Sequence, residues 1–426
     1  MKTSLKSKAL KFIPAALVAG VLIASLALPH TVPFGGVKLL TYGYGYGLGG
    51  GFAPPPVQYH PLTPARIMDT RLGGASIGAG QTLPVQVAGQ GGIPLVGTTA
   101  AVVNVTATDG TAPSYLTIWP TGTPQPVAST LNWTTGKTVA NLVQITLGAG
   151  GKLSVFNAQG NVQVIFDVEG YVSVPTGIPG ADGLYNSLVP SRILDTRNGI
   201  GAPTAKVGAG ATLDLQVIGT GGVPSGVEAV TLNVTVDNAT APSYITAFPK
   251  GATRPVASNL NFVAGQIVPN RVIVKVGAGG KVSLFNAAGN VDLIADVNGY
   301  FTDLSGSPSG DVFIGLTPNR IMDTRLGGSP LAANSTLHMN VRGQGGIPAG
   351  AHTAVLNVTV TNPTAGSYLT LWPTGATQPV ASDLNFVAGL TVANKVIVKI
   401  GANGQVDVFN AAGSTQVIVD VVGWYN

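Results

Sequence analysis

The sequence predicts an all-β protein: three tandem antiparallel β-sandwich domains of the jelly-roll or immunoglobulin-like kind, after a signal peptide and a spacer rich in Gly, Tyr and Pro. Three observations predict it. One motif occurs three times, apolar residues alternate with period two or form short β-branched runs, and no stretch has the period of a long amphipathic helix. Seven or eight short strands per roughly 120 residues are typical of a sandwich.

The repeated motif reads Pro-x-Arg-x-x-Asp-Thr-Arg and begins at Pro64, Pro190 and Pro318. Its first arginines are 126 and 128 positions apart, which is the size of an ordinary domain and far exceeds a solenoid repeat of roughly 20–50 residues. We therefore expect three domains that fold separately, like beads on a string. The expected divisions are a signal peptide at 1–27, a spacer at 28–58, the first repeat at 59–174, a linker at 175–184, the second repeat at 185–303, a linker at 304–312 and the third repeat at 313–426.

The N-terminus has the layout of a secretory leader: four lysines, the apolar stretch Phe12–Leu28 and a small-x-small site that ends at Ala27. We expect cleavage there and a secreted, extracellular protein at the cell surface. An uncleaved anchor is the alternative, because the apolar stretch is only slightly shorter than the roughly 20 residues that span a bilayer. In that case the leader would be the protein's only contact with a membrane.

Charge is scarce, since only 9% of the residues are charged against about a quarter in typical proteins. The net charge of +5 owes most to the leader, without which 18 basic residues face 17 acidic ones. The basic residues are dispersed, so the sequence predicts no nucleic-acid partner. With no cysteine, the fold must be held without disulfide bonds.

The first repeat shows seven runs of strand character. A turn at Phe156–Val162 is expected to form a hairpin, in which Gly160 supplies a positive φ. The expected strands are Thr82–Val87, Ala101–Thr106, Tyr115–Trp119, Leu131–Thr134, Leu142–Leu147, Leu153–Phe156 and Val162–Val168.

Four charged positions recur in all three repeats, although most others change between copies. A charge retained in so uncharged a module indicates a buried or half-buried arginine–carboxylate network, in which an arginine of the opening motif pairs with the closing aspartate and joins the first and last strands. The alternative, a catalytic carboxylate pair or hard-cation site at Asp69 and Asp167, is weakened because arginines compete for the same oxygens. The network residues are Arg66, Asp69, Arg71 and Asp167; Arg192, Asp195, Arg197 and Asp296; and Arg320, Asp323, Arg325 and Asp420.

Asparagines also recur at matched positions, for example Asn104, Asn233 and Asn357. Asparagine disfavours the middle of a strand unless its amide satisfies nearby backbone groups. We therefore expect these side chains to bind loop backbone.

Aromatic residues recur on one expected strand and form the best candidate for a ligand site. They would share a strand face, with Leu116 and Ile118 opposite, and an exposed strip of this kind could stack on sugar rings. Packing in the core is the competing interpretation. The candidate glycan-binding residues are Tyr115, Trp119, Tyr244, Phe248, Tyr368 and Trp372.

Signs of catalysis are weak. The four histidines are not matched between repeats, and there is no cysteine to serve as a nucleophile or zinc ligand. The sequence predicts no enzyme, no cofactor and no metal site.

Several motifs together resemble a repeated β-domain of exported bacterial proteins, a mostly uncharacterised family that is sometimes appended to cell-wall hydrolases. They are the opening motif, Leu-Asn-Val-Thr-Val at Leu232–Val236, Tyr-Leu-Thr-x-Trp-Pro at Tyr115–Pro120, Pro-Val-Ala-Ser-x-Leu-Asn at Pro126–Asn132, and a closing Val-Asp-Val-x-Gly-Tyr/Trp. The resemblance covers all three repeats. It implies an extracellular, envelope-associated module and supplies no catalytic residues.

Two functions follow as hypotheses. The first is a non-enzymatic extracellular structural or cell-surface protein, associated with the envelope or with copies of itself and able to assemble into a layer, sheath or fibre, because polar uncharged faces tolerate close packing. The second is a multivalent glycan-binding or cell-wall-binding protein that uses the Tyr and Trp strand faces and gains by avidity.

Overall fold

The computed structural model describes residues 57–175, 180–305 and 309–426, so the expected signal peptide and nearly all of the spacer lie outside the described residues. These ranges contain 24 strands, four short 3-10 helices and no α-helix. No helix in them is long and apolar enough to cross a membrane.

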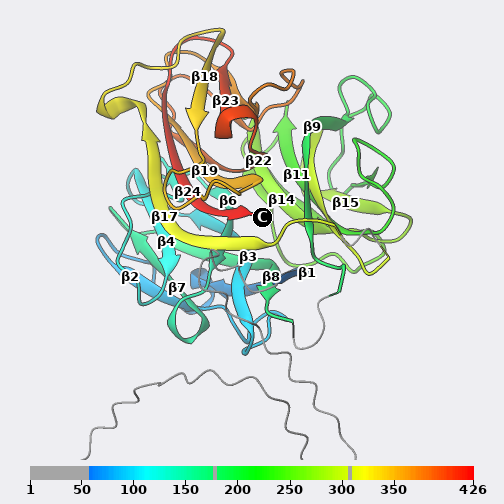
Figure 1. Ribbon diagram of the computed structural model, residues 1–426, viewed down its shortest axis with the longest axis horizontal. Coiled ribbons are helices and arrows are strands. Elements are labelled where there is room, and N and C mark those ends of the chain that lie inside the picture. Colours follow the sequence, from blue (N-terminus) through cyan, green and yellow to red (C-terminus); the bar gives the residue numbers. More distant parts are fainter. Residues whose placement is uncertain (1–56, 176–179, 306–308) are drawn as a thin grey trace, which may run out of the picture. The chain divides into compact units, whose positions relative to one another are not determined.

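Each repeat forms two antiparallel sheets of four strands, and successive strands along the chain often alternate between the two (Figure 1). We call the three sheets that meet at the centre the inner sheets and the other three the outer sheets. The inner sheets have the orders β1-β8-β3-β6, β9-β16-β11-β14 and β17-β24-β19-β22, and the outer sheets have the orders β2-β7-β4-β5, β10-β15-β12-β13 and β18-β23-β20-β21.

The strands of the first repeat are β1 (Gln58–Asp69), β2 (Thr82–Gln86), β3 (Thr98–Thr108), β4 (Ser114–Pro120), β5 (Leu131–Trp133), β6 (Val139–Thr146), β7 (Lys152–Asn157) and β8 (Gln163–Ser173). Those of the second are β9 (Tyr185–Asp195), β10 (Thr212–Gln216), β11 (Val227–Asp237), β12 (Ser243–Pro249), β13 (Leu260–Phe262), β14 (Val268–Lys275), β15 (Lys281–Asn286) and β16 (Asp292–Thr302). Those of the third are β17 (Phe313–Asp323), β18 (Ser335–Asn340), β19 (Thr353–Thr361), β20 (Ser367–Pro373), β21 (Leu384–Phe386), β22 (Val392–Lys399), β23 (Gln405–Asn410) and β24 (Gln416–Tyr425).

The two sheets of each repeat enclose an apolar core of their own. In the first repeat, the alternation along β4 points Leu116 and Ile118 into this core, where both are fully buried. The seven expected strands correspond to β2–β8, with ends shifted by a few residues. The expected hairpin is wrong: the turn after Asn157 connects β7 to β8, which belong to different sheets, although Gly160 has the positive φ of +60°.

A fourth core joins the repeats. It consists of side chains on the second face of the three inner sheets, together with Tyr59, Tyr185, Phe301 and Tyr425. The rings of Tyr185 and Tyr425, from the second and third repeats, stack with centroids 4.3 Å apart. The inner strands are therefore buried on both faces, as β3 shows with nine consecutive buried residues.

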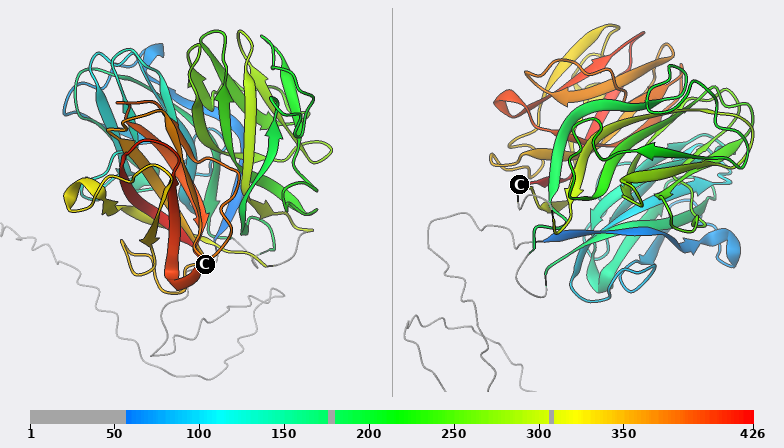
Figure 2. Two further views of the ribbon diagram at one scale, coloured as in Figure 1. Left: turned by 90° about the horizontal axis from the view of Figure 1, so that it is seen from above. Right: turned by 90° about the vertical axis from the view of Figure 1, so that its right-hand side faces the viewer.

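A closed cycle of asparagine contacts runs through all three repeats. Asn141 donates to Asn357, Asn394 donates to Asn233 and Asn270 donates to Asn104, at 2.8, 2.9 and 2.9 Å. Each of the three donating amides also accepts from a backbone N–H of another repeat, at Lys395, Arg271 or Leu142. The contacts go from first to third, third to second and second to first repeat, so they close on themselves, and Figure 2 shows each repeat lying beside the other two.

The centre of the cycle breaks the symmetry of the repeats, because Leu142, Arg271 and Lys395 occupy the same position in β6, β14 and β22. Arg271 is completely buried and donates to Asp383 of the third repeat at 2.7 Å. Burial lowers the pKa of Lys395 to about 7. Three copies of Arg271 or of Lys395 would repel one another, so three different repeats suit this centre better than three identical ones.

The prediction of three tandem, separately folded sandwich domains is wrong. The chain forms six small four-stranded sheets in a six-bladed, propeller-like arrangement, and Pro54–Asn426 is one compact unit. The physical reason lies in runs such as Val272-Ile273-Val274, which place apolar side chains on both faces of a strand. A separate domain would leave one of those faces in water.

Candidate binding grooves between the repeats

The recurring charges form the same network in each repeat. Arg66 on β1 donates to both carboxylate oxygens of Asp167 on β8, at 2.8 and 3.0 Å. Arg192 binds Asp296 and Arg320 binds Asp420 in the same way, each with a shorter contact of 2.8 Å. The first and last strands of every repeat are thus joined by a bidentate ion pair, which is the strongest arrangement of a guanidinium and a carboxylate.

The second half of the motif builds a tight turn after the first strand. The carboxylate of Asp69 accepts from the backbone N–H of Arg71 and from its guanidinium, with the shortest contact at 2.6 Å. These bonds to Arg71 are the main reason that the pKa of Asp69 lies below its usual value. The hydroxyl of Thr70 meanwhile bonds to Gln163 and accepts from the N–H of Val164 on β8.

The buried aspartates also contact the next repeat. Asp167 accepts at 3.4 Å from the backbone N–H of Ser258, which belongs to the second repeat, and Asp296 accepts likewise from Ser382 of the third. Burial raises the pKa of Asp167, and the bonds from Arg66 and Ser258 oppose that rise. The oxygens of Asp69 and Asp167 are thus occupied by N–H donors, and the described residues contain no cluster of acidic or histidine side chains able to hold a metal ion.

The expected exposed strip of tyrosine and tryptophan does not form. Trp119, Phe248 and Trp372 are 6%, 6% and 4% exposed, and the indole N–H of Trp119 donates to the carbonyl of Thr123. The three tyrosines differ from these rings, because Tyr115, Tyr244 and Tyr368 are 38%, 37% and 38% exposed.

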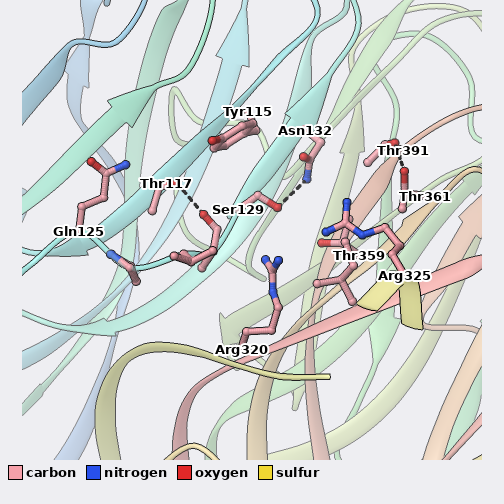
Figure 3. A pocket seen from close by; sticks show the side chains of 14 residues that line it. Tyr115, Thr117, Gln125, Ser129, Asn132, Arg320, Arg325, Thr359, Thr361 and Thr391 are labelled. Carbon is pink, nitrogen blue, oxygen red and sulfur yellow. Dashed lines mark hydrogen bonds between the residues drawn. The ribbon is translucent and has the colours of Figure 1, made fainter. Parts of the chain in front are cut away.

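The exposed tyrosine of the first repeat faces arginines of the third across a groove of about 620 Å³ (Figure 3). Tyr115, Asn132 and the loop Gln125–Ser129 line one side. Arg320, Arg325 and three threonines line the other, where the hydroxyls of Thr361 and Thr391 bond to each other at 2.8 Å. We call this the first groove; its volume lies in the range of small-molecule sites.

A second groove of about 340 Å³ repeats the arrangement between the second and first repeats. Tyr244, Asn261 and the loop Arg254–Ser258 lie on one side, with Arg66 and Arg71 on the other. Arg254 adds a third guanidinium, which lies 3.8 Å from the centroid of the Phe285 ring. The tyrosine side and the arginine side of each groove therefore come from different repeats.

A third seam contains the corresponding parts. The loop that ends at Ser382 in the third repeat is held against the second repeat by Asn233, as Asn104 holds Ser258 at the second groove. The equivalent positions of the strands make Tyr368 the counterpart of Tyr115 and Tyr244, and Arg192 and Arg197 the counterparts of Arg320 and Arg325.

Two sets of residues that were predicted separately lie together in the structure. They are the tyrosines of the candidate glycan-binding set and the arginines of the ion network. The structure leaves Trp119, Phe248 and Trp372 outside both grooves. Sequence reasoning missed Thr361 and Thr391 in the first groove. Their only signal was a threonine at the end of a strand and one just before a strand, and both are also common wherever a strand end meets water.

No protein-family model matches this chain, and no curated protein matches it in sequence. Structural comparison finds a chain described under the triple jelly roll fold and turret assembly of an archaeal virus, at 11% identity over 86% of this chain and 89% of that one, with a TM-score of 0.18. A chain of Sulfolobus turreted icosahedral virus has 11% identity over 86% and 90%, with the same TM-score.

A tandem of carbohydrate-binding modules from Paenibacillus barcinonensis has 14% identity over 54% of this chain and 85% of that one, with a TM-score of 0.16. TM-scores this low do not establish a shared fold, so the chain's function has to be argued from its own grooves.

Proposed function

We propose that this protein is a non-enzymatic, multivalent glycan-binding protein whose sites are the grooves between its repeats. One observation carries the proposal: an exposed tyrosine stands opposite two arginines and a bonded pair of threonine hydroxyls, Thr361 with Thr391 in the first groove and Thr108 with Thr138 in the second. A sugar offers an apolar ring face and many hydroxyl groups. Tyrosine stacks on the first, and guanidinium, amide and hydroxyl groups bind the second.

Repetition within one unit supports the same proposal. Weak sites on a single chain gain affinity when one polymer engages several of them, without any new contact. The secretory layout of the leader and the family resemblance favour a polysaccharide of the cell envelope as the target. Extracellular location and envelope association are part of this proposal.

The test is binding of the protein, from residue 28 onward, to insoluble cell-wall polysaccharide. Tyr115→Ala combined with Tyr244→Ala and Tyr368→Ala should weaken binding at least about tenfold, the equivalent of 1.4 kcal/mol. The control is Leu95→Ala, which removes a side chain that is 68% exposed and lines neither groove. Unchanged binding by a folded triple variant would overturn the proposal.

A second candidate is the structural surface protein, which a specific observation favours. Val127, Val256 and Val380 occupy the same loop position in the three repeats and are 82%, 79% and 81% exposed. Exposed valines at equivalent positions around a unit suit packing against further copies. Filaments or sheets that form at high concentration, and are lost in a folded triple Val→Ser variant but kept in the triple tyrosine variant, would establish this candidate.

A further inference from the structure

Charge differs among the three copies of the proposed site. We propose, on the basis of the glycan-binding function above, that the ligand is an acidic polysaccharide bearing carboxylate groups. We further propose that only the first and second grooves accept it, because Asp237 blocks the third seam. The three copies differ at one nitrogen atom of one arginine, Nη1 of Arg325, Arg71 or Arg197.

In the first groove that atom is Nη1 of Arg325. Nε and Nη2 of this guanidinium bind Asp323 at 2.8 and 2.6 Å, whereas Nη1 makes no hydrogen bond within the described residues. The side chain is 43% exposed and lines the groove (Figure 3). Arg71 has the same arrangement in the second groove, where its side chain is 42% exposed. A guanidinium edge with free N–H groups is a preferred partner for a carboxylate.

In the third seam the corresponding nitrogen is already occupied. Nη1 of Arg197 donates to Asp237 at 2.8 Å, and Arg197 is 33% exposed. Asp237 takes the position that Thr108 and Thr361 hold in the other repeats, as the strand registers show. The protein's own carboxylate thus binds where we place the carboxylate of the ligand, and its charge repels a second one.

Other charged groups near the grooves leave this contrast intact. Asp109 raises the pKa of Arg71 from within the first repeat, but neither it nor its counterpart in the third repeat, the uncharged Asn362, lines a groove. Arg254 adds positive charge to the second groove, where the first has the neutral Gln125. Arg320 and Arg66 remain paired with aspartates of their own repeats.

The probe is an oligogalacturonate, compared with a neutral oligogalactose of the same length by calorimetric titration at low ionic strength, where charge pairs are least screened. The wild-type protein should bind two oligogalacturonates per chain. The neutral sugar should bind at least about tenfold more weakly, as expected when a charge-assisted hydrogen bond is lost.

The repeats supply their own exchange variants. Asp237→Thr gives the third seam the residue of the other two and should raise the stoichiometry from two to three. Thr361→Asp gives the first groove the residue of the third and should lower it to one. The matched control is Thr336→Asp, which makes the same change on the exposed face of β18 and should leave two sites.

The outcomes separate this inference from the proposed function. Equal affinity for the acidic and neutral sugars, with the triple tyrosine variant still defective, would overturn the acidic class and leave glycan binding in place. Three sites in the wild type, or two in Asp237→Thr, would overturn the role of Asp237. Failure to bind either sugar or whole-wall polysaccharide would overturn both.

Discussion

Asn141 donates a hydrogen bond to the side-chain oxygen of Asn357 at 2.8 Å, although 216 positions separate the two residues. Asn141 also donates to the carbonyl of Thr130 and accepts from the N–H of Lys395, so one amide joins the first repeat to the third. Both asparagines are buried. The pair explains why asparagine recurs inside strands whose other residues are mostly apolar or β-branched.

Replacing Asn141 with alanine should destabilise the entire unit. It leaves buried backbone and amide groups unsatisfied, each of which costs about 1–3 kcal/mol. Chemical denaturation should give one cooperative transition at a lower midpoint, because the cycle belongs to no single repeat. Asn132→Ala is the control, since Asn132 is half-buried and makes one contact of 3.3 Å, to Ser129. Separate transitions for the three repeats would contradict the closed arrangement.

Asp167→Ala should affect two repeats. It leaves the half-buried Arg66 without its main partner, and loss of one member of such a pair costs about 3–5 kcal/mol. It also frees the N–H of Ser258 in the second repeat, where hydrogen exchange should accelerate beyond the change at other amides of that repeat. Lys137→Ala, at an exposed position of the first repeat, should change neither quantity. Exchange effects confined to the first repeat would show that the contact with Ser258 is unimportant.

Stability should depend on the titration of Lys395. Its pKa falls from 10.5 to about 7 on folding because the side chain is buried. Between these values the unfolded chain binds more protons, so the free energy of unfolding rises with pH, by a few kcal/mol in all. Lys395→Met should remove this rise between pH 7 and 10.5 and be more stable than wild type at pH 7.

The matched variant Lys399→Met, at the exposed end of the same strand, should keep the wild-type pH dependence. The measurement is denaturant unfolding at a series of pH values. Parallel curves for wild type and Lys395→Met would mean that the ammonium group finds compensation in the folded state.

Trp119 should matter for folding and not for binding. Trp119→Ala removes a buried indole, and such truncations cost about 3–5 kcal/mol. Trp119→Phe should be nearly neutral, because Phe248 fills the same position in the second repeat. Thermal unfolding and glycan binding of both variants provide the check. A selective loss of binding in a stable Trp119→Phe protein would restore the exposed-strip hypothesis.

Much of each repeat could be predicted from the sequence because strand signals are local. Alternation along β4 indicates that Leu116 and Ile118 are buried, and the recurrence of Arg66 and Asp167 indicates a pair within one repeat. The burial of Trp119 could not be predicted, since period two gives only the side of the strand and not whether a loop carbonyl, here that of Thr123, lies over the ring.

The sequence by itself determined three copies of one β module, the positions of most strands, and the arginine–aspartate pairs that join first to last strand. Only the tertiary structure decided that the three repeats pack into one closed unit and that Tyr115 faces Arg325 across a groove. It also decided that Asp237 forms an ion pair with Arg197, the counterpart of Arg325 at the third seam. Those relationships join residues on separate repeats, or residues 40 positions apart within one repeat. Local periodicity shows which residues of a strand are apolar, but it does not show which distant part of the chain packs on the second face of that strand.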